Sequence, residues 1–279
     1  MKFAAAVTLY NPTETQLRNC ISYTKTFDYV FLIDNSEPSI DLSNIYLNNS
    51  KIKYIDMKGN KGLSDAFNEV LNRIDDFECD YVCTLDQDSK YFGKDIEVMK
   101  EFIVDSSLKK YYNINPNNVG IYAPVIDYGG GTHSNKLFEK RKRVITSGSF
   151  LNIKIINQLG IRYDSNYFID RFDIDFCQQL IEKKLDIILY YKSVLYQCLG
   201  EGDNKNHSSH NLIRHYYIFR NRLYFNKKYF KPIKRYTLNF LQTLKHIIHI
   251  IIYEPNKVSK IKQLFPAIQD YYRGKMGKM

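Results

Sequence analysis

The sequence of 279 residues has no tryptophan and contains only five cysteines, seven prolines and thirteen glycines. The cysteine count is odd and the sequence has no Cys-x-x-Cys pair, which argues against a disulfide framework or a zinc ribbon. The first fourteen residues contain one Lys and a short apolar run, but they lack a signal-peptide cleavage site. We therefore predict a protein of the reducing cytoplasm whose chain begins with a strand.

The sequence also lacks an apolar run long enough to cross a membrane. Its most apolar stretch, residues 238–253, is interrupted by Lys245, His246 and His249. This stretch supplies about half to three-quarters of the roughly 20 apolar residues that a membrane span needs. Two alternatives remain, a buried core helix and an amphipathic helix that lies in the membrane interface beside basic neighbours.

Acidic residues are scarce in the last third of the chain. Residues 201–279 hold 16 Lys and Arg against 4 Asp and Glu, a net charge of +12, whereas residues 1–200 hold 24 against 26, a net charge of −2. A basic region of this kind suits nucleic acid, an anionic membrane leaflet or the phosphate groups of a substrate.

The composition is otherwise that of a folded protein, with 44% hydrophobic and 25% charged residues. Short β-branched or aromatic runs followed by turn residues alternate with helical patterns, and this alternation predicts a mostly parallel sheet flanked by helices. Ligands of such sheets bind at the carboxyl ends of the strands. The strands are expected at residues 3–9, 29–33, 52–55, 81–85, 119–124 and 187–196.

The second half of the chain is less regular. We expect a loop over residues 105–118, then a strand, a Ser-Gly-Ser turn and a helix start over 144–155, and a loop leading into a helix over 167–184. From residue 211 onward the pattern is helical and basic. We therefore expect an α/β region, 1–210, followed by a basic helical region, 211–279.

One acidic motif directly follows a predicted strand. Asp86 and Asp88 flank Gln87, so both carboxylates can face one cation at the carboxyl end of that strand. Paired carboxylates of this kind suit Mg²⁺ or Mn²⁺ and leave coordination sites for phosphate oxygens. The alternative is a simple turn and helix cap.

A second acidic cluster stands before a predicted helix, at Asp170, Asp173 and Asp175. The aromatic and aliphatic residues between these carboxylates would desolvate one of them and raise its pKa toward that of a general base. The alternative is an acidic helix start that is stabilised by the helix dipole.

A third group combines basic and aromatic side chains. On a helix Arg214, Tyr217 and Asn221 would share one face with Arg220 beside them, and this arrangement suits phosphate oxygens. His207 is a candidate ligand for a metal or a phosphate. The alternative is a solvated basic helix face.

Together these motifs resemble the inverting family 2 glycosyltransferases of the GT-A fold, in particular the rhamnosyltransferase-like branch that builds bacterial surface polysaccharides. The resemblance covers nearly the whole chain. It rests on residues 7–12 (Val-Thr-Leu-Tyr-Asn-Pro), 33–36 (Ile-Asp-Asn-Ser), 60–68 (Asn-Lys-Gly-Leu-Ser-Asp-Ala-Phe-Asn), 85–89 (Leu-Asp-Gln-Asp-Ser), 146–149, 168–177, 214–221 and 270–278.

The resemblance implies an α/β fold of the GT-A type and a metal-dependent, inverting transferase. Residues 1–210 would be its nucleotide-sugar-binding and catalytic domain, and the basic helical region 211–279 would contact the membrane or the acceptor. Asp173 would be the general base, and Asp34 would accept a hydrogen bond from the pyrimidine base. The donor-nucleotide site would consist of Thr8, Tyr10, Asn11, Asp34, Asn60, Lys61, Asp86 and Gln87. Asp86, Asp88 and His207 would bind Mn²⁺ or Mg²⁺, Arg214, Tyr217 and Arg220 would bind the diphosphate, and Ser147, Gly148 and Asp170 would contact the acceptor.

The implied donor is dTDP-rhamnose, with UDP-galactofuranose or another UDP-hexose as the alternative. The implied acceptor is a lipid-linked glycan for capsule, O-antigen or cell-wall synthesis, and the basic region would hold the protein on the anionic inner face of the cell membrane. No nucleic acid partner is expected, and a homodimer is left open.

The chain departs from the branch at Gln178 and Gln179, where Arg is usual, and at Gln197, where a His is frequent. Metal binding would then depend on Asp88, His207 or His210. Two interpretations from other classes are a protein that binds nucleic acid through its basic region, which needs no Asp173, and an inactive scaffold of an assembly complex, which the presence of Asp86, Asp88 and Asp173 argues against.

Overall fold

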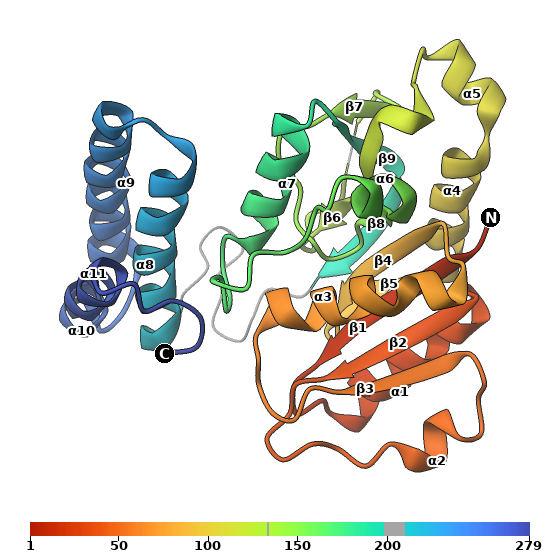
Figure 1. Ribbon diagram of the computed structural model, residues 1–279, viewed down its shortest axis with the longest axis horizontal. Helices are drawn as coiled ribbons and strands as arrows, with labels where there is room; N and C mark the ends of the chain where they lie inside the picture. The colour runs from red at the N-terminus through yellow and green to blue at the C-terminus, as the bar shows by residue number, and fades with distance from the viewer. Residues whose placement is uncertain (133, 198–209) are drawn as a thin grey trace.

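The computed structural model describes residues 1–132, 134–197 and 210–279 (Figure 1). The strands are β1 (Phe3–Leu9), β2 (Tyr29–Asp34), β3 (Ile52–Asp56), β4 (Tyr81–Asp86), β5 (Ser89–Tyr91), β6 (Val119–Asp127), β7 (Phe138–Lys140), β8 (Phe150–Asn152) and β9 (Asp186–Gln197). The helices are α1 (Glu14–Ser22), α2 (Ser43–Tyr46), α3 (Leu63–Arg73), α4 (Gly93–Val104), α5 (Ser106–Tyr111), α6 (Ile153–Gln158), α7 (Phe172–Glu182), α8 (Leu212–Tyr229), α9 (Pro232–Tyr253), α10 (Lys257–Lys262) and α11 (Leu264–Tyr272). Short 3₁₀ turns are η1 (Tyr23–Lys25), η2 (Ile74–Phe77) and η3 (Pro116–Asn118).

One sheet organises the described part of the chain, in the order β3-β2-β1-β4-β8-β6-β9-β5, with β7 paired to β9. The parallel ladders β1-β2, β1-β4, β2-β3 and β6-β9 are the long ones, with five to eight residue pairs each. The antiparallel ladders hold two or three pairs each. The sheet is therefore mostly parallel, as the alternating sequence pattern predicted.

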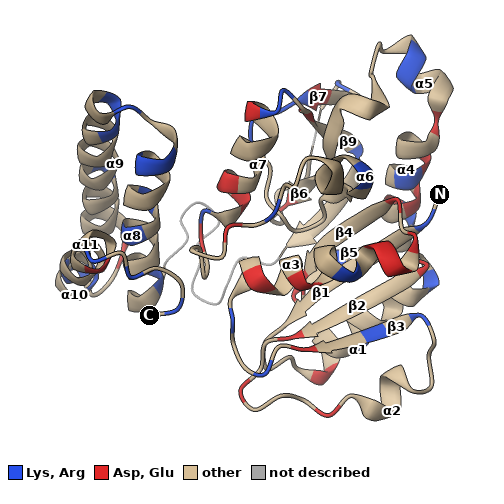
Figure 2. Ribbon diagram, in the orientation of Figure 1, with Lys and Arg blue, Asp and Glu red and all other residues tan. Residues whose placement is uncertain are grey.

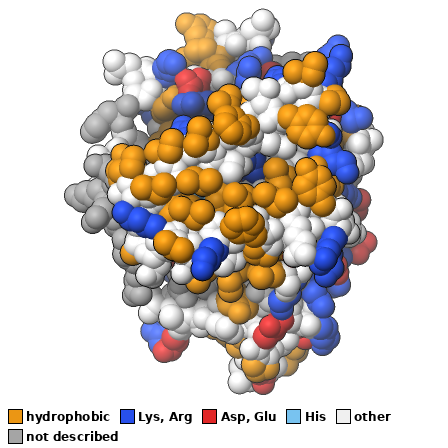
Figure 3. All heavy atoms as spheres, turned by 90° about the vertical axis from the view of Figure 1, so that its left-hand side faces the viewer, with side chains coloured by type: hydrophobic (Ala, Val, Ile, Leu, Met, Phe, Trp, Pro, Cys, Tyr) orange, Lys and Arg blue, Asp and Glu red, His pale blue; other side chains and the backbone are white. Residues whose placement is uncertain are grey.

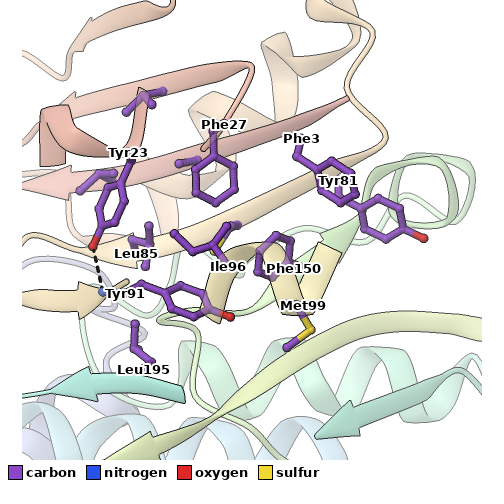
Figure 4. Packing of buried hydrophobic residues seen from close by; sticks show 14 of the residues in the cluster. Phe3, Tyr23, Phe27, Tyr81, Leu85, Tyr91, Ile96, Met99, Phe150 and Leu195 are labelled. Carbon is purple, nitrogen blue, oxygen red and sulfur yellow. Dashed lines mark hydrogen bonds between the residues drawn. The ribbon is translucent and has the colours of Figure 1, made fainter. Parts of the chain in front are cut away.

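The core lies on both faces of this sheet. Alternate residues of a strand point to opposite faces, and in β1 Ala5 and Val7 join one apolar cluster while Ala4 and Ala6 join the other. Helix α4 covers the first face with Ile96 and its neighbours, as Figure 4 shows. Helices α3, α6 and α7 cover the second face. Burial on both sides explains why the first strands are apolar throughout.

Two segments differ from the sequence-based expectation. Residues 144–146 are not a strand: the carbonyl oxygen of Thr146 accepts hydrogen bonds from the side-chain hydroxyl of Thr84 and from the Ser149 N–H of the turn, and no ladder N–H of the described residues donates to it. The strand β8 follows the turn. The expected loop over 105–118 contains helix α5, since the Asp105 side chain caps it by accepting from the backbone N–H groups of Ser107 and Leu108.

Helices α8 to α11 form a bundle at the left of Figure 1 with an apolar cluster of their own, centred on Tyr216, Phe219 and Ile250. Within α9, which the structure describes throughout, Ile250 alone is buried. The alternative that residues 238–253 form a buried core helix is therefore wrong. In the described ranges, every helix is too short or too polar to cross a bilayer.

A buried carboxylate joins three of these helices. Glu254, directly after α9, is 3% exposed and pairs with His215 of α8 at 2.9 Å and with Lys260 of α10 at 2.6 Å. Burial by itself would raise the pKa of Glu254, but the hydrogen bonds from Lys260 and His215 outweigh it and hold the pKa below the ordinary 4.5. The pairing thus stabilises the bundle above pH 4.5, and this stabilisation is lost as the pH falls through the lowered pKa.

We predict that Glu254→Gln lowers the free energy of unfolding at neutral pH by about 3 kcal/mol, because it leaves Lys260 buried opposite an uncharged group. Urea unfolding measures the loss. The matched control is Glu14→Gln, which removes an exposed pair with Arg18 and should cost under about 1 kcal/mol. Equal losses in the two variants would show that the buried pair does not hold the bundle together.

Candidate functional site

A cavity of about 320 Å³ opens at the carboxyl ends of β1, β2 and β4. This is the edge at which open α/β sheets bind their ligands, and the volume is in the range of ligand pockets. Of the expected site residues, it is lined by Thr8, Tyr10, Asn60, Asp86, Gln87 and Asp88. A larger hollow of about 770 Å³ lies at the opposite edge, beside the first residue of β1 and the residues that precede β2 and β3.

Gln87 ties the first and fourth strands together at the floor of this cavity. Its side-chain oxygen accepts from the Tyr10 backbone N–H at 2.7 Å, and its side-chain nitrogen donates to the Tyr10 carbonyl at 3.1 Å. The next residue, Asn11, has a left-handed φ of 46° and donates its backbone N–H to Ser36. These bonds hold the ends of β1, β2 and β4 in one arrangement.

The opposite wall of the cavity is a close approach between Gly62, before α3, and Phe168, before α7. A Cβ on Gly62 would lie 2.5 Å from the Phe168 carbonyl oxygen, and φ at Gly62 is +88°. Leu63 donates its N–H to the same oxygen at 3.0 Å. Only glycine permits this approach. The wall consists of Gly62, Leu63, Phe168 and Ile169, and Leu9 and Asn35 complete the lining of the cavity. The sequence analysis did not predict this wall.

Asp34 does not line the cavity. Its side chain is fully buried, and its oxygens accept from the N–H of Ser36 at 2.9 Å, the N–H of Ile40 at 2.7 Å and the hydroxyl of Tyr54 at 2.8 Å. The expectation that Asp34 accepts a bond from the base is therefore corrected, because the loop after β2 already occupies both oxygens. The neighbouring Asn35 lines the cavity in its place.

Asn60 and Lys61 precede α3, and Asn60 lines the cavity whereas Lys61 is not part of its lining. Lys61 is exposed, and its backbone N–H donates to the Asn35 side chain at 3.2 Å. The Asn60 N–H donates to Glu37 at 2.9 Å, and Glu37 pairs with Lys278 at 2.7 Å. The last residues of the chain thus lie beside the nucleotide loop, a neighbourhood that local pattern could not reveal.

The charges of two carboxylates and one guanidinium act on Asp86, which lines the cavity. Burial, followed by the negative charge of Asp88, raises the pKa of Asp86 to about 6; Asp173 raises it further, while Ser147 and Arg214 act in the opposite direction. Asp86 is the last residue of β4 and Asp88 lies between β4 and β5, whereas Asp173 is in α7 and Arg214 is in α8. The structure therefore brings together charges that are up to 128 positions apart.

Asp173 lies in the first turn of α7 and carries the perturbation expected of a general base. Burial raises its pKa above the ordinary 3.8, and the charge of Asp170 adds to this, although the Ile174 N–H donates to Asp173 at 2.7 Å and opposes it. Asp175 has a different role. It is fully buried and accepts bonds from Lys228, Tyr229 and Gln179.

The three residues expected at the diphosphate separate in the structure. Arg214 is 46% exposed and donates to Asp170 from two nitrogens, at 3.2 and 3.1 Å, so it stays at the rim. Arg220 is 1% exposed and donates to the carbonyls of Lys275 and Gly277. Its assignment to the diphosphate is corrected, because the last residues of the chain take up its guanidinium.

Tyr217 is also buried. Its ring stacks on Phe168 at 5.3 Å, and its hydroxyl accepts from the Met279 N–H at 2.8 Å. Since Phe168 lines the cavity, Tyr217 supports the wall from behind and does not face the diphosphate.

Two of the expected acceptor residues form the support below Asp86. The Ser147 hydroxyl accepts from the Asp86 N–H at 3.2 Å and bonds the Ser89 hydroxyl at 2.7 Å. Gly148 has a φ of +80°, and a Cβ there would lie 2.7 Å from Pro124. In Asp170, the third expected residue, one carboxylate oxygen accepts from Arg214. The other oxygen is buried and has no hydrogen-bond partner in the described structure.

The candidate ligands for a metal are Asp86 and Asp88; His207, the third residue expected there, lies outside the described residues, in the range 198–209. Within the described ranges, no three His, Cys, Asp or Glu side chains are arranged to hold a metal. The pKa of Asp86 is raised first by burial and then by the charge of Asp88, so a cation beside the pair would favour its ionised form. Two hard oxygen ligands beside an open cavity fit Mg²⁺ or Mn²⁺, which bind through one or two carboxylates plus phosphate oxygens. His210, which the sequence analysis named as a further possible metal ligand, donates its backbone N–H to Glu254, and its ring lies beside that of His215.

Comparison with solved structures identifies the architecture. The chain matches GalNAc-T7 with UDP, GalNAc and Mn²⁺ at a TM-score of 0.55, with 14% identity, over 71% of this chain and 44% of that one. It matches Staphylococcus aureus TarS 1–349 with UDP-GlcNAc at 0.53, with 14% identity, over 98% of this chain and 73% of that one. The fold is that of the GT-A glycosyltransferases. The strands that carry Tyr10 and Asp86 thus belong to a GT-A sheet.

Sequence comparison agrees with this fold. A curated relative, the dTDP-rhamnosyl transferase RfbF of Shigella flexneri, is 22% identical over 291 residues, which cover 98% of this chain and 96% of that protein. No protein-family model matches the chain.

We predict that Gly62→Ala weakens binding of a nucleoside diphosphate and lowers thermal stability, because its Cβ would push Phe168 out of the cavity wall. Isothermal calorimetry with dTDP and UDP and a thermal melt measure the two effects. Gly160→Ala is the matched control: φ there is also positive, at +62°, but the added Cβ meets nothing within 4 Å. If both variants behave alike, the approach of Phe168 does not shape the cavity.

Asp86→Asn is expected to abolish the increase in dTDP or UDP affinity that Mn²⁺ produces, since it removes one of two anionic ligands. Calorimetry with Mn²⁺ and with EDTA measures the difference. The control is Asp65→Asn, which changes a carboxylate on α3 that is not in the cavity lining. A metal-dependent gain that survives in Asp86→Asn would contradict the assignment.

Proposed function

We propose that this protein is an inverting glycosyltransferase that moves a sugar, rhamnose in the first place, from a nucleoside-diphosphate sugar to a glycan acceptor. The observation that carries the proposal is the acidic pair Asp86 and Asp88 in the lining of a cavity at the carboxyl edge of the sheet, with Asp173 and Arg214 near enough for their charges to shift the pKa of Asp86. It joins an acidic pair suited to a metal-bound diphosphate with a separate carboxylate whose raised pKa suits a base. The GT-A fold and the similarity to a dTDP-rhamnosyl transferase support it.

The donor nucleotide occupies the cavity between Tyr10 and Asn60, with Thr8 and Gln87 beside it and Lys61 at its edge. A dTDP-sugar is the first candidate because the curated relative is named for it. A UDP-hexose is the second candidate, because TarS is solved with UDP-GlcNAc and GalNAc-T7 with UDP.

The transfer is a single displacement. The acceptor hydroxyl oxygen forms a bond to the anomeric carbon as the bond from that carbon to the diphosphate oxygen breaks, and Asp173 takes the hydroxyl proton. Attack from the face opposite the leaving group inverts the configuration. Arg214 offsets negative charge that grows on the diphosphate.

A divalent cation bound by Asp86 and Asp88 would stabilise the departing diphosphate as a Lewis acid. The chain's own contribution is to orient the acidic pair. Ser147 holds the backbone of Asp86, and Gln87 holds the end of β1 against the end of β4.

We infer that the acceptor is a lipid-linked glycan of capsule, O-antigen or cell-wall synthesis, reached at the inner face of the cell membrane. Ser147, Gly148 and Asp170 stay the candidate positions near the acceptor, with Asp170 the one that borders the open rim. A chain with a large exposed apolar surface on α9 suits an acceptor that is itself held in a bilayer.

Asp173→Asn is expected to lower the rate of sugar transfer roughly 100-fold to 10,000-fold while binding of dTDP or UDP is unchanged, because the variant cannot accept the hydroxyl proton. Radiolabelled transfer from dTDP-rhamnose and calorimetry measure the two properties. Asp175→Asn, which changes a buried carboxylate bonded to Lys228, reports on folding alone. Full transfer activity in Asp173→Asn would point to a scaffold or to another base.

The transfer rate should fall as the pH is lowered through the pKa of Asp173, with a midpoint above the ordinary 3.8, because only the ionised carboxylate accepts a proton. Asp86, with a pKa of about 6, also becomes protonated as the pH is lowered. Donor affinity measured at each pH separates the two groups, since loss of rate at constant affinity belongs to Asp173. A flat profile down to pH 4 would contradict the role of Asp173 as the base.

A further inference from the structure

Helix α9 carries an exposed apolar stripe that runs along its length. Its members, spaced by three, four or seven residues, lie on one side of the helix: Ile233, Phe240, Leu244, Ile248 and Ile251. Their exposed fractions run from 44% to 85%. Figure 3 shows apolar side chains gathered in a broad band across this face of the molecule. We call this stripe, with Val258 of α10 beside it, the α9 face.

Three polar residues of α9, Asn239, Gln242 and His246, point the other way, toward α8. The Asn226 side chain donates to Asn239 at 2.7 Å and to Gln242 at 3.1 Å. Arg222 donates to the Gln242 carbonyl and to His246. The inner side of α9 is thus satisfied by hydrogen bonds, which leaves the apolar side outward. A continuous stripe of exposed apolar side chains on a protein surface indicates a binding site for another molecule or for a membrane.

Charge decides between two occupants, a second copy of this chain and an anionic bilayer. Residues 231–279 hold ten Lys and Arg but only two acidic residues, Glu254 and Asp270. Glu254 is buried with Lys260, and Asp270 is half-buried and accepts from Tyr216. The exposed charge around the α9 face is therefore positive. Two such faces in contact would oppose cation to cation, whereas an anionic lipid surface would attract them.

We propose that the α9 face is a docking surface for an anionic lipid bilayer, on which α9 lies in the plane of the interface. Lys234 and Lys245 stand at positions that place them beside the stripe, where their ammonium groups meet lipid phosphates. The contact is an interfacial one, in keeping with a helix that is too polar to cross the bilayer. It extends the proposed function, because it supplies the surface that presents a lipid-linked acceptor, but it does not depend on sugar transfer.

The position of the α9 face relative to the site supports this use. Helix α8 contacts α9 through Arg222 and Asn226, and contacts the loop before Asp173 through Asn221. The docked helix and the catalytic loop are therefore attached to one rigid helix. In Figure 1 α9 lies on the outer side of α8, away from the sheet. The bilayer would thus lie about one helix diameter, roughly 10 Å, beyond α8.

Vesicle flotation of the full chain tests the proposal. We expect the protein to float with vesicles of phosphatidylcholine and phosphatidylglycerol, and to float less with phosphatidylcholine alone or at high salt. Phe240→Gln, Leu244→Gln and Ile251→Gln, combined in one variant, should weaken binding to the anionic vesicles at least about tenfold. Lys234→Gln with Lys245→Gln should reduce the binding and its dependence on salt.

The control variant combines Leu47→Gln with Val104→Gln, two apolar residues exposed elsewhere, at 74% and 49%, and should bind vesicles as the parent chain does. Calorimetric affinity for dTDP or UDP should be equal in all variants, which shows that they fold and separates this test from that of the transferase. Failure of the parent chain to bind anionic vesicles, or equal binding by the triple variant, would overturn the proposal. Sedimentation that shows a dimer of the parent chain, dissociated in the triple variant, would assign the α9 face to a second copy and would also overturn it.

Discussion

The Asn221 side chain holds the segment on which the site depends. It is fully buried in α8, and its amide nitrogen donates to the carbonyls of Ile169 at 2.7 Å and Asp170 at 3.1 Å. Asp170 and Arg171 both have left-handed backbone angles, at φ of 59° and 71°, which non-glycine residues adopt only when their surroundings impose it. The bonds from Asn221, with the pair between Arg214 and Asp170, provide that constraint. Without them, the turn that precedes Asp173 would have no reason to persist.

This dependence makes the basic helical region part of the framework of the candidate site. Its residues Arg214 and Asn221 secure the loop before α7, and Arg220 secures the last residues of the chain, which in turn reach Glu37 beside Asn60. Figure 2 shows basic residues on α8, and acidic residues on the neighbouring α7 and at the carboxyl ends of the central strands. The basic end of the sequence and its acidic motifs thus lie beside each other in the folded protein.

That arrangement makes ionisation of Asp86 unfavourable. Burial is the main cause of its raised pKa of about 6, and the negative charges of Asp88 and Asp173 add to it. A protein keeps a carboxylate in such surroundings where function requires it. A cation bound beside Asp86 would offset this charge.

Helix α9 illustrates why hydropathy alone left two alternatives. Asn239, Gln242 and His246 make the stretch look like a helix with a solvent side, yet these residues face α8, where Arg222 and Asn226 bond them. The apolar residues, which would normally enter a core, remain outside. Periodicity identifies the two sides of a helix, but the neighbours available to each side decide which one is buried.

Local pattern was sufficient for the parallel strands and for the carboxyl-edge position of Asp86 and Asp88. It also predicted a raised pKa for one carboxylate of the cluster at Asp170, Asp173 and Asp175, without saying which. Strand periodicity, turn residues and the direction of parallel strands are short-range properties that residues a few positions apart already specify. The burial of Asp34, the diversion of Arg220 to Lys275 and Gly277, and the wall made by Gly62 and Phe168 were decided only by the tertiary structure. Each depends on contacts between segments far apart in the chain, and a charged side chain bonds whichever partner the fold brings near it.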